Sequence, residues 1–118
     1  MLVAVLATPP AIICQSPRAV DGDTIRCANL ARSVRLVGID APELPGHCRR
    51  GRECTPGDGP AAKRALAGLM RLGPVRVQIT GKDRYVRHLA LVSAGGQNLN
   101  CQLLRTGHAV RRYSRLSC

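Results

Sequence analysis

The feature that most constrains this chain is the stretch from Val34 to Glu43, which reads VRLVGIDAPE. Its first four residues have β-strand character, whereas Pro42 lacks the amide hydrogen that the interior of a strand requires. A strand is therefore expected to end near Asp40. Asp40 and Glu43 then lie at the end of a rigid strand, where two carboxylates can share a hard cation or divide the roles of metal ligand and general base.

Basic residues far outnumber acidic ones. The chain has 18 Lys and Arg against 7 Asp and Glu, a formal charge of +11 at pH 7, and nearly all of the positive charge is arginine. Because guanidinium groups bind phosphate oxygens in a bidentate manner, the expected partner is nucleic acid or another polyanion. A basic surface that serves only solubility is the alternative.

The few acids are grouped. Four of the seven fall in two short clusters at expected strand ends, Asp21 with Asp23 and Asp40 with Glu43. A chain selected only to be basic has little reason to cluster its acids, whereas a site that holds a cation against a phosphate needs such clusters.

Six cysteines in 118 residues favour disulfides and an oxidising compartment. Zinc is the weaker alternative, because the chain has no CxxC pair and the spacing of Cys48 and Cys54 is too wide for the usual knuckle. Disulfides are expected to close a short loop, to cross the first hairpin and to fix the C-terminus. The preferred pairs are Cys48–Cys54, Cys14–Cys27 and Cys101–Cys118. A secreted or periplasmic location follows.

Residues 1–11 are apolar, but they lack a basic start and are too short to span a bilayer. Residues 1–13 are interpreted either as the remnant of a signal peptide or as a frayed N-terminus. The domain is expected to cover residues 14–118, with no membrane partner.

Strand patterns alternate with turn signals along the rest of the chain. A helix is expected after an Asp58 cap, ending at Gly73, and a shorter one is expected to start at Asn98 or Asn100. Strands are expected over residues 11–20, 23–27, 34–39, 75–80 and 88–93, the first three as an antiparallel meander. This order predicts a mainly β domain with helices (α+β), a five-stranded Greek-key barrel of the oligonucleotide/oligosaccharide-binding (OB) type with one longer and one short helix.

Three segments now point to a known family. They are DGDT at 21–24, VRLVGIDAPE at 34–43 and KDRYVRHLA at 82–90, and the tail over 103–113 is similar too. The chain resembles the staphylococcal nuclease-like (thermonuclease) family over most of its length. DGDT alone is a weak signal, but three segments in order and at matching separations are specific.

The resemblance implies a calcium-dependent, sugar-nonspecific phosphodiesterase that hydrolyses DNA and RNA and leaves 3′-phosphates. By position, Asp23, Asp40 and the backbone carbonyl of Ala41 are the expected calcium ligands. Glu43 is the expected general base for the attacking water. Ala41 replaces a hydroxyl residue of the best-studied member, but a carbonyl ligand does not need that side chain.

The same resemblance implies that Arg35 and Arg87 bind the scissile phosphate and stabilise charge in the transition state. Arg84, Tyr85 and Tyr113 are the expected contacts to the terminal phosphate and base of the nucleotide. In an ideal strand Arg35 and Asp40 point to opposite faces, so this arrangement requires a bend or bulge near residue 38.

Simpler interpretations stay open for each residue. The aspartates could be turn formers, Glu43 a solvated loop acid, the arginines surface charges and the tyrosines packing residues. An OB module that binds nucleic acid or another polyanion without cutting it is the alternative function. A disulfide-linked domain that binds acidic polysaccharide or protein is a weaker one. No obligate protein partner is implied, and a monomer is expected.

Overall fold

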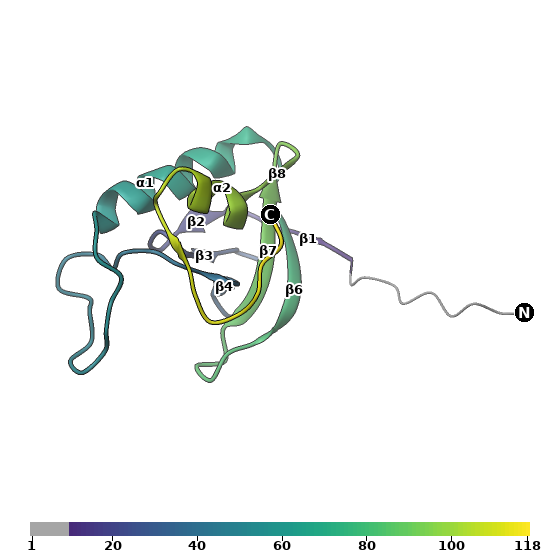
Figure 1. The fold of residues 1–118 in the computed structure, drawn as a ribbon. Helices are drawn as coiled ribbons and strands as arrows, with labels where there is room; N and C mark the ends of the chain where they lie inside the picture. Colours follow the sequence, from purple (N-terminus) through teal and green to yellow (C-terminus); the bar gives the residue numbers. More distant parts are fainter. Residues whose placement is uncertain (1–9) are drawn as a thin grey trace, which may run out of the picture.

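The computed structural model describes residues 10–118, so most of the expected signal remnant or frayed N-terminus lies outside the described residues. Figure 1 shows a strongly curved sheet with both helices on one side of it. The strands are β1 (Ile12–Ile13), β2 (Arg18–Ala19), β3 (Thr24–Arg26), β4 (Val34–Leu36), β5 (Ile39–Asp40), β6 (Arg76–Lys82), β7 (His88–Ala94), β8 (Gln97–Asn98) and β9 (Val110–Arg111). The helices are α1 (Gly59–Leu69), a 3-10 turn η1 (Met70–Leu72) and α2 (Leu99–Arg105).

The main sheet is mixed and has the order β1-β6-β7-β4-β3-β2, with β8 paired to β7. β4 and β7 run parallel, and the other neighbours are antiparallel. The strands at its two ends are separated by only four residues of chain. There the amide of Cys14 donates to the carbonyl of Val75 at 2.8 Å, and the amide of Ala28 donates to the carbonyl of Gln15 at 2.7 Å. The ends of the sheet are thus joined, which confirms the predicted α+β fold of OB type.

The expected three-strand antiparallel meander is present as β2, β3 and β4, but the expected single strand over residues 11–20 is wrong. The segment is divided into β1, which pairs with β6, and β2, which pairs with β3. Ser16, with φ of 48°, and Pro17, which has no amide hydrogen, interrupt it, because neither residue continues a ladder. The division lets one segment of chain serve both ends of the curved sheet.

The bend expected near residue 38 is present. β4 ends at Leu36, and Gly38 takes a φ of 78° before the chain resumes as β5, which pairs with β9 in a separate two-stranded sheet. A positive φ of this kind is readily adopted by glycine and is costly for other residues. The expected strand over 34–39 is therefore two short strands joined by a turn.

Helix α1 covers the core with one apolar face. Asp58 caps it by accepting a hydrogen bond from the amide of Ala61 at 3.0 Å. Ala62 and Leu66 of α1 and Met70 of η1 are buried. Since the chain has no Phe or Trp, these side chains meet an aliphatic core that includes Ile25, Leu36, Val77 and Leu103.

Asn98, not Asn100, caps α2, with its side chain accepting from the amide of Cys101 at 3.0 Å. Asn100 is fully buried and links α2 to the sheet. Its side chain accepts from the amide of Val92 and donates to the carbonyls of Val37 and Ala90 at 2.9–3.1 Å. Every polar atom of the Asn100 amide is therefore used between two strands.

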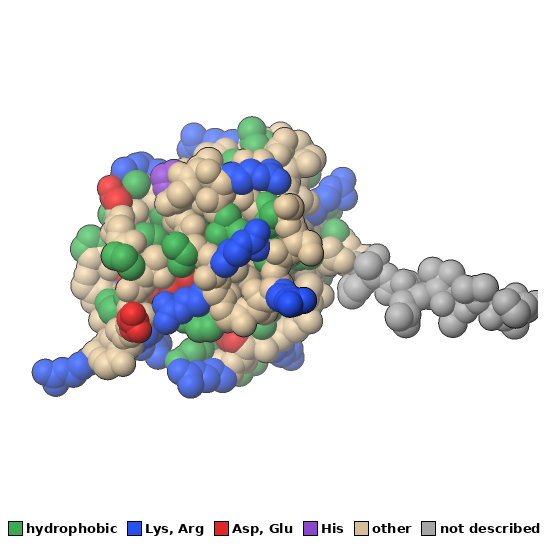
Figure 2. Space-filling view, viewed as in Figure 1, with side chains coloured by type: hydrophobic (Ala, Val, Ile, Leu, Met, Phe, Trp, Pro, Cys, Tyr) green, Lys and Arg blue, Asp and Glu red, His purple; other side chains and the backbone are tan. Residues whose placement is uncertain are grey.

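Three disulfides connect the pairs that the sequence favoured: Cys14–Cys27, Cys48–Cys54 and Cys101–Cys118. The first lies where the ends of the sheet meet, and the second closes a loop before α1. Figure 2 shows Lys and Arg side chains spread over the visible face with few acids between them. None of the helices within residues 10–118 has the length and apolar character needed to cross a bilayer.

Candidate active site

The turn between β2 and β3 places Asp23 against the start of the loop after β5. Asp21 forms this turn by accepting a hydrogen bond from the amide of Asp23 at 3.0 Å. The buried carboxylate of Asp23 accepts from the amide of Ala41 at 2.8 Å and from the hydroxyl of Thr24 at 3.1 Å. Two segments far apart in the sequence are thus held together by one carboxylate.

Arg35 is the centre of the buried part of the site. Its Nη1 donates to the carbonyls of Leu36 and Ile39, both at 2.9 Å, so the guanidinium fills the turn around Gly38. Its Nη2 lies 3.0 Å from Asp40 and 3.3 Å from Asp23. The side chain is only 8% exposed. The bend in the chain therefore brings Arg35 to both acid clusters, as the sequence required.

Asp40 is more heavily bonded than the sequence indicated. Besides Arg35, its carboxylate accepts from Arg52 at 3.3 Å, Arg112 at 3.2 Å and the hydroxyl of Thr55 at 2.6 Å. The side chain is 1% exposed. Four side chains therefore hold this buried carboxylate in place.

Glu43 lies at the edge of the site, on the loop that follows β5. The N-terminus of α1 packs against its backbone, and a side chain at Gly59 would clash with the carbonyl oxygen of Glu43. This close approach requires glycine at position 59. The carboxylate of Glu43 accepts from Arg52 at 2.9 Å and is 19% exposed.

The turn between β6 and β7 supplies the exposed part of the site. Asp83 closes this turn by accepting from the amides of Tyr85 and Arg87 at 2.9 and 3.0 Å, and from Nε of Arg87 at 2.7 Å. The ring of Tyr85 is 48% exposed. The guanidinium groups of Arg49, Arg84 and Arg87 lie 5.0–5.5 Å from its centre.

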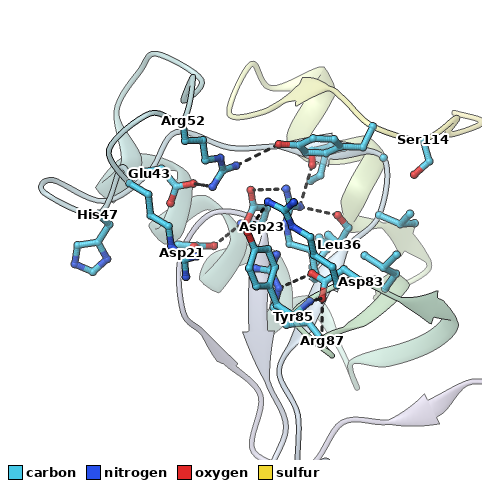
Figure 3. A pocket seen from close by; sticks show the side chains of 18 residues that line it. Asp21, Asp23, Leu36, Glu43, His47, Arg52, Asp83, Tyr85, Arg87 and Ser114 are labelled. Atoms are coloured by element: carbon cyan, nitrogen blue, oxygen red, sulfur yellow. Dashed lines mark hydrogen bonds and ion pairs between the residues drawn. The ribbon is translucent and has the colours of Figure 1, made fainter.

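One cavity of about 760 Å³ connects these parts. It brings together most of the residues singled out in the sequence, and Figure 3 shows Asp23, Glu43, Tyr85 and Arg87 around it. The predicted residues on its wall are Asp23, Arg35, Glu43, Arg84, Tyr85, Arg87 and Tyr113. Asp40 and Ala41 are buried next to it, at 1% and 2% exposure.

Burial dominates the ionisation of Asp23 and raises the pKa of its carboxyl to about 7. The positive charge of Arg35 opposes this shift, while the negative charge of Asp21 adds to it. Burial also acts to raise the pKa of Asp83, but hydrogen bonds from Arg87 and Tyr85 outweigh it and leave that pKa below its usual value. A hydrogen bond from Arg84 lowers the pKa of the Tyr85 hydroxyl.

Comparison with known proteins agrees with this geometry. The family model described as staphylococcal nuclease homologue matches residues 33–117. The chain belongs to the staphylococcal nuclease family. A curated relative from Haemophilus influenzae, named an uncharacterized endonuclease, is 35% identical over 99 residues, which cover 81% of this chain and 50% of the relative. The chain thus spans about half the length of that relative.

Residues that the family resemblance did not indicate also belong to the site. Arg52, Thr55 and Arg112 all contact Asp40. Arg49 and Arg52 come from the Cys48–Cys54 loop, which has the sequence CRRGREC. Arginines confined between two cysteines are a signal that could have pointed to this loop, whereas nothing local marks Arg112.

The donor groups fit a hard cation such as calcium. Carboxylate oxygens of Asp23 and Asp40 both lie within 3.3 Å of the same nitrogen of Arg35, and the backbone of Ala41 adjoins them. These are the oxygen ligands that calcium prefers. In residues 10–118 no three His, Cys, Asp or Glu side chains gather closely enough to form a metal site by themselves. A divalent cation bound here would therefore also need a carbonyl or water oxygen as a ligand.

Proposed function

We propose that this member of the staphylococcal nuclease family is a calcium-dependent, sugar-nonspecific nuclease that hydrolyses phosphodiester bonds of DNA and RNA and leaves 3′-phosphates. The observation that carries the proposal is the single cavity that Asp23, Arg35, Glu43 and Arg87 share. The family match and the name of the Haemophilus influenzae relative support the same reaction class.

Phosphodiester hydrolysis requires an activated water, neutralisation of the phosphate and fixed positions for both. Glu43 is the residue placed to orient or deprotonate the attacking water, because it is a partly exposed carboxylate on the cavity wall. Asp23, Asp40 and the carbonyl of Ala41 hold the calcium ion, whose charge stabilises the phosphate when it is bound.

Arg35 and Arg87 contribute fixed positive charge toward the phosphate, since a guanidinium stays protonated. Arg87 is tethered to Asp83 through Nε, and its two terminal nitrogens make no hydrogen bond to the residues described here. Those nitrogens therefore remain available for phosphate oxygens. Arg35 has less freedom, because both of its terminal nitrogens already donate to the protein.

Tyr85 and Tyr113 are the exposed rings on which bases can stack, at 48% and 70% exposure. Arg84 lies beside Tyr85 and donates to its hydroxyl at 2.8 Å, so a terminal phosphate near the ring meets positive charge. These contacts do not distinguish ribose from deoxyribose, which suits a sugar-nonspecific enzyme. The three disulfides support a secreted or periplasmic location, and we propose that the enzyme acts as a monomer.

The test is cleavage of supercoiled plasmid and of a labelled RNA with calcium and then with a chelator. Cleavage is expected only with calcium, and Glu43→Gln is expected to lower its rate roughly 100-fold or more, because a general base is lost. Product ends are checked by polymerase extension, which a 3′-phosphate blocks until a phosphatase removes it. Equal rates for wild type and Glu43→Gln would contradict the proposal.

A second function, binding of nucleic acid without cleavage, is favoured by one observation. The carboxylates of Asp40 and Glu43 are both paired with Arg52. A binding module is expected to hold single-stranded oligonucleotides equally well with and without calcium. Its affinity then falls with salt but not on Asp40→Ala substitution.

A further inference from the structure

Arg52 lies where a cation for the acid cluster would be expected. Its Nη1 is 2.9 Å from Glu43 and its Nη2 is 3.3 Å from Asp40, so one guanidinium bridges both carboxylates. Nη2 also lies 3.4 Å from the hydroxyl of Tyr113. Figure 3 shows the Arg52 side chain directed toward Glu43 at the rim of the cavity.

The residue comes from a segment with its own covalent constraint. Cys48 and Cys54 form a disulfide, and the amide of Arg52 donates to the carbonyl of Arg49 at 3.1 Å within the loop that it closes. This loop contains no helix or strand. The disulfide limits the conformations of the loop and so keeps the guanidinium of Arg52 near the acids.

Three arginines pair with Asp40, and two of them, Arg35 and Arg52, differ in how firmly they are held. Arg35 is 8% exposed and has four acceptors, two of them backbone carbonyls of the adjacent turn. Arg52 is 37% exposed, and its contacts to the acids are made only by the tip of a long side chain. Arg52 can therefore leave the carboxylates by rotating into solvent, whereas Arg35 cannot leave without disrupting the turn.

We propose that Arg52 is an internal counter-ion of the acid cluster, which pairs with Asp40 and Glu43 and leaves them when a divalent cation binds. Since the guanidinium and the cation compete for the same carboxylates, Arg52 sets the cation concentration that the site requires. This inference rests on the proposed function in one respect, namely that the acid cluster binds calcium.

The experiment compares calcium binding by wild type, Arg52→Gln and Arg50→Gln in isothermal titration without nucleic acid. Arg50 is the matched control: it is an exposed arginine of the same loop and forms no ion pair with any residue of the described range. Both variants remove one positive charge, so any difference between them reports the contact with the acids. Arg52→Gln is expected to bind calcium about 5-fold more tightly than Arg50→Gln, as the loss of a partly exposed ion pair implies.

A second experiment removes the disulfide that closes the loop and leaves Arg52 in place. Cys48→Ser/Cys54→Ser is expected to tighten calcium binding in the same direction, because the untethered loop holds Arg52 less firmly. Combining it with Arg52→Gln should add little, since both changes act through one contact. Full additivity would contradict the role given to the disulfide.

Equal or weaker calcium binding by Arg52→Gln relative to Arg50→Gln overturns the inference, as does the absence of calcium binding in all three proteins. The cleavage assay reports separately on the nuclease proposal. If wild type cleaves nucleic acid with calcium but Arg52→Gln and Arg50→Gln bind calcium equally, only the role of Arg52 is overturned. Tighter binding by Arg52→Gln in a protein that does not cleave overturns only the nuclease.

Discussion

The buried acid cluster and the exposed β6–β7 turn both place arginines beside carboxylates, but they do so by different physical means. In the cluster, Arg35 contacts Asp23 and Asp40, which lie 12 and 5 residues away along the chain and are almost inaccessible to water. In the turn, Arg87 pairs with Asp83 only four residues away, and the side chain is 33% exposed.

This comparison separates the groups that hold the site from the groups that can meet a substrate. Charges in the cluster are largely neutralised by one another, and removing Arg35 takes an ion-pair partner from two buried carboxylates at once. Charges in the turn are screened by water and contribute little to stability, but their free nitrogens and the ring of Tyr85 face the cavity. Mutations in the two regions should therefore affect different quantities.

The largest effect on stability is expected for Arg35→Gln. It removes one guanidinium donor from each of two buried carboxylates and from two turn carbonyls, so the free energy of unfolding should fall by about 3–5 kcal/mol. Arg87→Gln is the matched control, with an expected loss of about 1 kcal/mol or less. Urea denaturation of both variants measures this difference. Similar losses for the two would remove the distinction between cluster and turn.

The second largest effect on stability is expected for Asp23, measured with a chelator present. Its folded pKa of about 7 lies above the ordinary value of 3.8, so its contribution to stability is present at low pH and is lost as the pH rises through about 7. Asp23→Asn should therefore raise the melting temperature at pH 8 with chelator present and have less effect at pH 5. The same variant should lose the increase in melting temperature that calcium gives to wild type. A lower melting temperature for the variant at pH 8 would contradict this account.

Substitution of Tyr85 tests whether the β6–β7 turn contributes to substrate binding without contributing to stability. Tyr85→Leu should weaken binding of a single-stranded oligonucleotide in chelator by roughly tenfold, because one stacking surface is lost, and should barely change stability. Tyr85→Phe keeps the ring and should bind almost as wild type does. Fluorescence anisotropy gives the affinities, and equal binding by the Leu and Phe variants would exclude stacking.

The smallest effect is expected for Asp83. Hydrogen bonds in the turn leave its folded pKa below the ordinary value, so its contribution is present above about pH 4 and is lost as the pH falls further. Asp83→Asn should cost about 1 kcal/mol at pH 7, and the difference from wild type should shrink below pH 4. Acid denaturation monitored by circular dichroism measures it. A constant difference across this range would assign the effect to packing instead.

Features that depend on near neighbours could be predicted from the sequence. The Asp58 cap and the turn made by Asp21 follow from the preferences of single residues within a few positions, and the same preferences limited the second cap to Asn98 or Asn100. The bend at Gly38 was expected because the family resemblance requires Arg35 and Asp40 to meet. The interruption of the first strand could not be predicted in the same way, because Pro17 is compatible with a bulge, an edge or a break. Pairing of its two halves with strands at opposite ends of the sheet is decided only when the sheet curves.

The sequence by itself determined which acids, arginines and cysteines this protein has. It also determined the turns that position some of them, because turn and cap preferences are short-range. Only the tertiary structure decided that Arg52 and Arg112 join Asp40, the latter across 72 positions of chain. Such contacts depend on which strands pair and on where a disulfide-closed loop packs. No local pattern of residue types carries that information.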